Sequence, residues 1–127
     1  IIRLLPFSMI YPTGKKQEKS KPRFPRFFQE ADLIAGDFHY IRRYMPSELP
    51  GKIIITNTVT NEDLSLLREK GVKTVITTTP EIEGRSFGTN VMEALLVAYT
   101  GSKKELKDDE YLLLLKELDF KPRIVQL

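Results

Sequence analysis

Short apolar runs separated by turn residues dominate the sequence from residue 24 onward, and this pattern predicts strands that alternate with helices. Residues 52–57 contain three consecutive isoleucines, as expected for a parallel strand that is covered on both faces. Residues 72–76 form a second run, rich in β-branched side chains. Shorter runs over residues 32–36 and 123–127 predict two further strands.

The segment between the two clearest strands carries the signals of a helix. Thr60 and Asp63 have the spacing of a capping box at its start, leucines supply an apolar stripe, and Gly71 follows as a left-handed terminator. A strand, a capped helix and a second strand form a βαβ unit, whose strands are parallel and whose crossover is right-handed. We therefore predict a Rossmann-like three-layer α/β domain with a mainly parallel sheet over residues 24–127.

Two short helices are expected earlier in the chain. One covers Pro25–Glu30 and points Phe24, Phe27 and Phe28 inward, and the other is a helical turn over residues 38–45. Both are bounded by prolines, which favour helix ends.

Two longer helices follow the strand at residues 72–76. The first covers residues 91–99 with Asn90 as its N-cap and Glu93 at capping-box spacing, and it is apolar on almost every side. Such a helix is buried in its own domain or at a partner surface, and a second copy of the chain is one such partner. The last helix is expected to be capped by Asp108 and to have a core stripe formed by Tyr111, Leu112, Leu114, Leu115 and Leu118.

The composition is that of a single globular domain of 127 residues, with a net charge of +3 and no cysteine. The absence of cysteine excludes disulfides and thiolate metal sites, and it fits the reducing cytoplasm, where we expect the protein to reside. No apolar run approaches the ~20 residues that span a bilayer, so no membrane partner is expected. Because the chain does not begin with methionine, we expect it to be the carboxyl-terminal part of a longer protein, whose missing amino-terminal region contacts this domain.

Residues 1–23 contain prolines and basic side chains but no sustained period, so they are predicted to form an arm or linker. A basic run of this kind either contacts nucleic-acid phosphates or is simply solvated. We favour the solvated linker, so nucleic acid is not an expected partner. The run consists of Lys15, Lys16, Lys19, Lys21, Arg23 and Arg26.

The linker between the strand at residues 72–76 and the helix at residues 91–99 is the first candidate site. Ligands of parallel α/β sheets bind at the carboxyl ends of strands, where this linker begins. It offers hydroxyls, a guanidinium, glycines and a helix start, which suit a small anionic ligand or a nucleotide. The alternative is that these residues only form the turn and cap the helix. The predicted cofactor-binding residues are Thr78, Thr79, Arg85, Ser86, Gly88, Thr89 and Asn90.

Asp37 and His39 form the second candidate site, just after the strand at residues 32–36. A carboxylate near an imidazole suits acid–base catalysis close to neutral pH, so these are the predicted catalytic residues. The alternatives are that Asp37 caps the following turn and that His39 has a structural or substrate-contact role. The predicted substrate-binding residues are Arg42, Arg43, Asn57 and Thr58.

No metal site is predicted. Glu81 and Glu83 form a loop pair without an evident further ligand, and one histidine with scattered carboxylates is poor evidence for zinc.

Residues 35–46, residues 77–80 and residues 84–94 together resemble the carboxyl-terminal part of the bacterial family labelled quinate (shikimate) 5-dehydrogenase. The resemblance covers nearly the whole chain. It implies a Rossmann-like fold, with NAD or NADP as a possible cofactor, and a further nucleotide-fold segment before Ile1.

True shikimate dehydrogenases are similar in having a strand that ends Asn-x-Thr-Pro and a later Met-rich helix that ends Trp-Thr-Gly. Residues 77–80, Met92 and residues 99–101 echo these features. The present stretch from Met92 to Gly101 is shorter, it lacks the substrate-binding glutamine, and the Lys–Asp catalytic pair belongs to a preceding domain absent from this chain. The resemblance therefore implies fold and ligand class without assigning catalytic residues.

The sequence thus favours a Rossmann-like portion of an oxidoreductase, similar to quinate or shikimate dehydrogenases, that binds a nucleotide or small anionic substrate at strand-end loops. The alternative is a non-catalytic ligand-binding or regulatory α/β domain.

Overall fold

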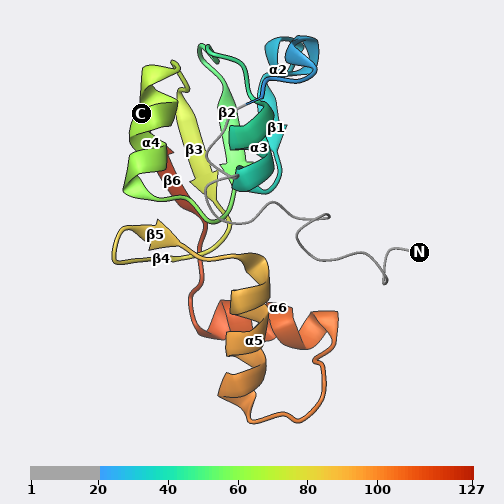
Figure 1. Cartoon of the computed structure of the whole chain (residues 1–127). Helices are drawn as coiled ribbons and strands as arrows, with labels where there is room; N and C mark the ends of the chain where they lie inside the picture. The colour runs from blue at the N-terminus through green and yellow to red at the C-terminus, as the bar shows by residue number, and fades with distance from the viewer. Residues whose placement is uncertain (1–20) are drawn as a thin grey trace, which may run out of the picture.

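A four-stranded sheet organises the protein, which the computed structural model describes over residues 21–127 (Figure 1). The strands β1 (Leu33–Ala35), β2 (Ile53–Thr56), β3 (Thr74–Thr77) and β6 (Arg123–Gln126) lie in the order β1-β2-β3-β6. β1, β2 and β3 are parallel, and β6 is antiparallel to β3. The sheet is therefore mixed and mostly parallel, and the prediction of three parallel strands is confirmed.

Helices and a small hairpin connect these strands. The predicted βαβ unit is confirmed, because the helix between β2 and β3 forms where the capping signals place it. The remaining elements are α2 (Pro25–Glu30), α3 (Phe38–Tyr44), α4 (Asn61–Glu69), the hairpin strands β4 (Glu81–Ile82) and β5 (Arg85–Ser86), α5 (Thr89–Thr100) and α6 (Asp108–Glu117).

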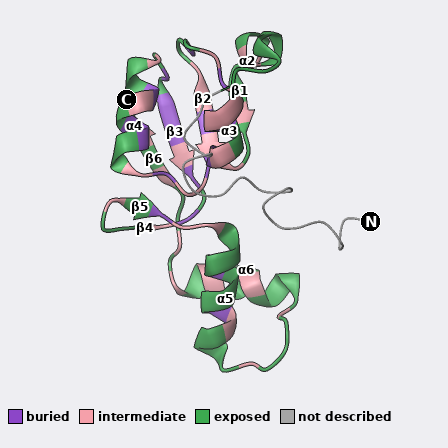
Figure 2. Ribbon diagram, viewed as in Figure 1, coloured by how far each residue is buried: buried purple, intermediate pink, exposed green. Residues whose placement is uncertain are grey.

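One face of the sheet carries the hydrophobic core (Figure 2). The strand register places Ile34, Ile54, Val75 and Val125 side by side on this face. Full burial of an aliphatic side chain stabilises a fold by about 1.5–3 kcal/mol, so this face is the main source of stability. α3 and α4 cover it, and the buried cluster consists of Phe38, Ile41, Met45, Leu49, Ile54, Val59, Leu64, Leu67, Val72 and Val75.

The buried carboxylate of Asp63 joins α4 to α3. Its Oδ2 accepts hydrogen bonds from the backbone N and the Oγ1 of Thr60 at 3.0 and 2.8 Å, and the Thr60 Oγ1 accepts from the Asp63 backbone N at 3.2 Å. The predicted capping box is therefore confirmed. The Oδ1 of Asp63 also accepts from Nη1 of Arg42 at 2.8 Å, which adds an ion pair between the two helices.

The opposite face of the sheet is mostly apolar, apart from the hydrogen-bonded pair Thr74 and Gln126, and no helix among residues 21–127 covers it. The register places Leu33, Ile53, Ile55, Ile76 and Ile124 on this face. Leu33 and Ile124 expose 48% and 64% of their surface, and the three other isoleucines are half-buried. α5 and α6 project away from the sheet (Figure 1). The described part of one chain therefore forms two layers, where the sequence predicts three.

The phenylalanines around α2 are only partly placed as predicted. Phe28 packs against the core cluster. Phe24 and Phe27 instead expose 67% of their surface and contact each other, with ring centroids 6.2 Å apart. A helix of six residues turns too little of its surface towards the sheet to bury all three rings.

The start of α5 differs from the prediction. Its N-cap is Gly88 and not Asn90, so Asn90 lies inside the first turn. Glu93 consequently completes no capping box, and its Oε1 accepts a hydrogen bond from the Tyr111 hydroxyl at 3.3 Å. Partial desolvation and the Glu93 carboxylate raise the pKa of the Tyr111 hydroxyl above its ordinary value of 10.0.

The leucine-rich helix α6 is not a core helix. None of its residues is buried, and Leu112, which was expected in the core stripe, is exposed. The helix begins after Lys107, whose backbone N donates to Oε2 of Glu110 at 2.7 Å, so Asp108 is not its cap. The predicted stripe fails because α6 packs on α5 and not on the sheet.

No helix within residues 21–127 is long and apolar enough to cross a membrane. Residues 1–20, with most of the predicted arm and three of the six residues of the basic run, lie outside the described residues, so the arm stays a prediction. At its described end, the backbone N atoms of Lys21 and Arg23 donate to the carbonyls of Arg43 and Tyr44 at 2.7 and 3.2 Å.

Replacing Asp63 with alanine is expected to destabilise the protein by about 3 kcal/mol, because it removes the capping box and leaves Arg42 without its carboxylate. Urea unfolding followed by circular dichroism measures this loss. Glu62→Ala is the matched control, since Glu62 lies in the same first turn but is exposed. Its expected effect is within about 0.5 kcal/mol. Equal losses in both variants would contradict this role for Asp63.

Candidate binding site

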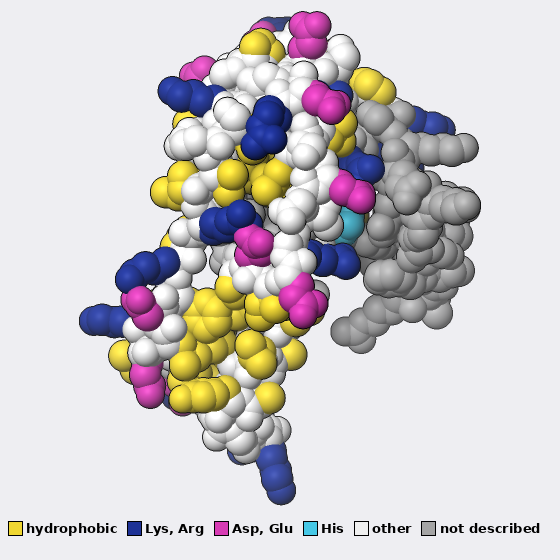
Figure 3. All heavy atoms as spheres, turned by 90° about the vertical axis from the view of Figure 1, so that its left-hand side faces the viewer, with side chains coloured by type: hydrophobic (Ala, Val, Ile, Leu, Met, Phe, Trp, Pro, Cys, Tyr) yellow, Lys and Arg dark blue, Asp and Glu magenta, His cyan; other side chains and the backbone are white. Residues whose placement is uncertain are grey.

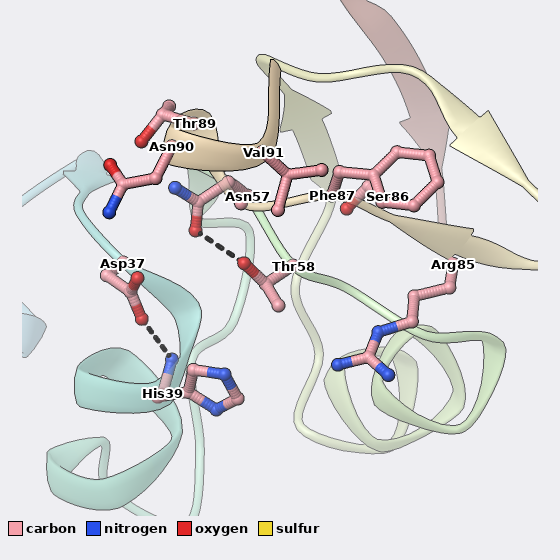
Figure 4. Close-up of a pocket in the computed structure, with 11 residues that line it drawn as sticks. Asp37, His39, Asn57, Thr58, Arg85, Ser86, Phe87, Thr89, Asn90 and Val91 are labelled. Atoms are coloured by element: carbon pink, nitrogen blue, oxygen red, sulfur yellow. Dashed lines mark hydrogen bonds between the residues drawn. The ribbon is translucent and has the colours of Figure 1, made fainter. Parts of the chain in front are cut away.

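A cavity of about 630 Å³ lies at the carboxyl ends of β1 and β2 (Figure 4). Three segments that are far apart in the sequence meet here: the β1–α3 junction, the end of β2, and the stretch from β5 into α5. The structure thus unites the two sites that the sequence suggests separately. The cavity is lined by Asp37, His39, Asn57, Thr58, Arg85, Ser86, Phe87, Gly88, Thr89, Asn90 and Val91.

A tight hairpin presents Arg85 at this cavity. Glu83 and Gly84 occupy its turn, with φ angles of 54° and 78°, the combination that a two-residue type I′ turn requires. The turn lies against the first residue of α4: the backbone N of Asn61 donates to the Gly84 carbonyl at 3.2 Å. The φ angle of Gly84 lies in the left-handed region, which favours glycine, and a Cβ there would also come within 2.6 Å of the Asn61 Nδ2 and displace that side chain.

The guanidinium of Arg85 has no ion-pair partner among residues 21–127. Glu81, in the facing strand of the same hairpin, pairs instead with Arg123. Figure 4 shows the Arg85 side chain extending from β5 back towards the side of the cavity that holds His39. An exposed cation held by a short hairpin at a cavity, and paired with no carboxylate among the described residues, is suited to an external anion.

The first turn of α5 adds hydrogen-bond donors to the same cavity. The backbone N atoms of Val91 and Met92 donate to the Gly88 carbonyl. Within the described part of the chain, the amides of Thr89 and Asn90 have no acceptor, and Gly88 offers no side-chain cap. The unpaired amides of a helix start carry a partial positive charge of about half a unit.

Thr58 adopts a backbone conformation that is rare for a β-branched residue. Its φ angle is 56°, in the left-handed region. Its backbone N donates to the Phe87 carbonyl at 3.3 Å, and its Oγ1 donates to the Asn57 Oδ1 at 3.1 Å. Such conformations cost on the order of 1–3 kcal/mol and concentrate at ligand sites. This strain marks the cavity independently of its charges.

Asp37 is the N-cap of α3. Its Oδ1 accepts a hydrogen bond from the backbone N of His39 at 2.9 Å, which confirms the capping alternative for this residue (Figure 4). The hydrogen bond joins Asp37 to the His39 backbone and not to its ring. The half-buried His39 lines the cavity, and the catalytic role predicted for both residues stays a prediction.

Other predicted site residues make contacts within the protein. Arg42 pairs with Asp63, and the Arg43 guanidinium lies 5.5 Å from the Tyr44 ring centroid. Neither arginine lines the cavity. Arg42 links α3, which carries His39 of the cavity, to α4, whose first residue holds the hairpin of Arg85, so its role here is a positioning one.

Three hydroxyls of the predicted cofactor site support the linker itself. The Thr79 Oγ1 donates to the Phe87 carbonyl at 2.6 Å, and the Thr78 Oγ1 donates to the Thr56 carbonyl at 3.4 Å. The buried Ser86 Oγ accepts from the Val59 backbone N at 2.7 Å, although Ser86 also borders the cavity.

Two lining residues were missed by sequence reasoning. Phe87 and Val91 border the cavity, whereas the sequence placed Val91 only in a buried helix. The available signal was their position: Phe87 lies between the candidates Ser86 and Gly88, and Val91 directly follows the candidate Asn90.

A second, more apolar cavity of about 430 Å³ lies on the other side of the start of α5. Thr78 and Thr79 border this cavity and not the first. The predicted cofactor residues are therefore divided between two cavities, which share Thr89. The second cavity is lined mainly by Met92, Leu96, Tyr111, Leu115, Phe120 and Pro122.

Comparison with protein-family models matches the whole chain, residues 1–127, to the family described as Domain of unknown function (DUF8754). The protein belongs to this family. Searches of curated proteins and of solved structures returned no match. The resemblance to quinate (shikimate) 5-dehydrogenases is not tested by these comparisons and stays a prediction. Over residues 21–127, no cluster of three or more histidine and carboxylate side chains is arranged to hold a metal ion.

Replacing Asp37 with alanine is expected to lower stability by about 1 kcal/mol, because α3 loses its N-cap. For a domain of this size the melting temperature should fall by roughly 4 °C. The control is Asp32→Ala, which removes an exposed carboxylate just before β1 and should change the melting temperature little. An unchanged melting temperature for Asp37→Ala would show that the capping bond contributes nothing to stability.

Proposed function

We propose that the protein binds a small anionic ligand, through a carboxylate or a phosphate, in the 630 Å³ cavity at the ends of β1 and β2. The observation that carries the proposal is that one cavity is lined both by Arg85 and by the first residues of α5, Thr89 and Asn90. Among residues 21–127, Arg85 has no ion-pair partner and the amides of Thr89 and Asn90 have no acceptor.

Two further properties of the cavity support this ligand class. Its volume lies within the range of about 300–1,000 Å³ that is usual for small-molecule sites. Its amide and hydroxyl groups, from Asn57, Thr58 and Asn90, suit the polar remainder of a hydroxy acid or a nucleotide. The apolar side chains of Phe87 and Val91 border the same space and suit the carbon skeleton of the ligand.

We further propose that the domain is a Rossmann-like variant from a cytoplasmic protein, in line with its parallel β1–β3 unit and its site at the carboxyl ends of the strands. NAD or NADP fits this site in part. Arg85 and the first turn of α5 would hold a phosphate, but no Gly-x-Gly-x-x-Gly turn follows any described strand. A bound nicotinamide would supply hydride transfer, and His39 would then be the group placed to exchange a proton with the substrate.

A non-catalytic binding domain is the second candidate function. It is favoured by the hydrogen bond of Asp37, whose Oδ1 caps α3 and so has a structural role that requires no catalysis. A ligand sensor needs only the anion-binding groups of the cavity. The two functions differ in what replacing His39 would do. In an enzyme the replacement would lower the turnover rate, and in a binding domain it would change ligand affinity alone.

A thermal-shift screen of the purified chain tests the proposal with inorganic phosphate, quinate, shikimate, NAD and NADP as probes. A ligand at a hundred times its Kd stabilises the folded state by about 2.7 kcal/mol, which gives a clear rise in melting temperature. Failure of every probe to raise it at millimolar concentration would argue against an anion site of this class.

Arg85→Ala is expected to weaken the binding of any responding probe at least tenfold, a loss of ~1.4 kcal/mol in calorimetry. The unliganded melting temperature should hardly change, because Arg85 has no ion-pair partner among the described residues. Arg68→Ala is the matched control: it removes an exposed arginine of α4 outside the cavity and should leave affinity unaltered. Equal affinity in the Arg85 variant and the wild type would overturn the assignment.

A further inference from the structure

Two mostly apolar surfaces are covered by no helix among residues 21–127, and each contains exposed side chains. The open sheet face consists of Leu33, Ile53, Ile55, Ile76 and Ile124. The second surface, the α5 stripe, consists of Val91, Leu95 and Tyr99. Each surface is of a kind that folded proteins normally bury.

The α5 stripe runs along one side of the helix. Its residues are spaced four apart, so their side chains follow one another along the same side. Val91, Leu95 and Tyr99 expose 54%, 54% and 60% of their surface. α6 does not cover them, since it contacts α5 near Glu93. Figure 3 shows hydrophobic side chains gathered over the α5–α6 part of the molecule.

No helix within residues 21–127 forms a layer on the open sheet face. Parallel strands occur almost only in sheets that are covered on both faces, and β2 has the isoleucine-rich sequence typical of that arrangement. α3 and α4 cover only the other face. The unmet requirement is therefore an apolar helix that packs across β1, β2 and β3.

We propose that two copies of the chain form a reciprocal dimer, in which the α5 stripe of each copy packs on the open sheet face of the other. α5 follows β3 in the chain, the position from which a helix in an α/β fold packs back onto its own sheet. Here the β4–β5 hairpin separates β3 from α5, and α5 projects beyond the sheet (Figure 1). A second copy offers this helix the same sheet surface, and it offers the sheet the missing third layer.

The size of the two surfaces favours the reciprocal arrangement over a contact through one of them. A stable interface buries roughly 800 Å² and 20–30 residues on each partner. Three side chains of α5 or five of the sheet supply too small an apolar core for such an interface. A two-fold axis makes the contact twice, so each protomer contributes both surfaces.

Sedimentation equilibrium of three variants tests the arrangement. Leu95→Glu alters the α5 stripe and Ile124→Glu alters the open sheet face, both at exposed positions outside the 630 Å³ cavity. The wild type should be a dimer, and each variant alone should raise the dissociation constant at least tenfold. The matched control is Leu113→Glu, which changes a leucine of α6 with 66% exposure and should leave the dimer intact.

Mixing the two variants gives the decisive result. One intact helix stripe then meets one intact sheet face, so the mixture should associate more tightly than either variant alone. A dimer made by α5 on α5 would survive Ile124→Glu, and a dimer made by sheet on sheet would survive Leu95→Glu. Either outcome, or a wild type that stays monomeric at about 100 µM, would overturn the proposal.

Cross-linking provides a second measurement that uses neutral substitutions. The chain has no cysteine, so Leu95→Cys and Ile124→Cys each introduce one unique thiol. A short bis-maleimide reagent should join a mixture of the two variants faster than it joins either variant to itself. Equal rates in the mixture and in the separate samples would contradict packing of helix on sheet.

Discussion

The buried carboxylate of Asp63 is the interaction on which the geometry of the candidate site depends. It accepts hydrogen bonds from Thr60, which start α4, and from Arg42, which belongs to α3. The start of α4 in turn holds the β4–β5 hairpin through the bond from Asn61 to Gly84. His39 on α3 and Arg85 on the hairpin are therefore positioned through the same carboxylate. The buried Asp63 thus helps to fix how far His39 and Arg85 lie from each other across the cavity.

Local signals in the sequence were sufficient for most of the fold. The isoleucine run, the capping box of Thr60 and Asp63 and the terminator Gly71 each act within a few residues, so β2, α4 and β3 lie where the sequence predicts them. The position of α5 and α6 was not predictable in this way. An apolar helix indicates that a partner surface exists, but its sequence does not say whether that surface lies in its own sheet or elsewhere.

The candidate site was predictable in its location and less so in its individual roles. The rule that ligands bind at the carboxyl ends of parallel strands led to two of the three segments that line the cavity, the β1–α3 junction and the stretch from β5 into α5. The contacts of Arg42 with Asp63 and of Thr79 with Phe87 depend on residues distant in sequence or across a turn, and residue type alone does not reveal them. Arginine and threonine side chains hydrogen-bond equally well to a ligand and to a backbone carbonyl or carboxylate of the protein itself.

The hairpin that carries Arg85 has a consequence for how this family can diversify. Its strands contain two residues each, and it contributes no side chain to the main hydrophobic cluster. Substitutions at Arg85 therefore alter the charge of the cavity at little cost to folding, whereas the turn glycine beside it is constrained. A change at this single position would alter which ligands the cavity attracts. The sheet would stay folded in such variants, so evolution could retain them.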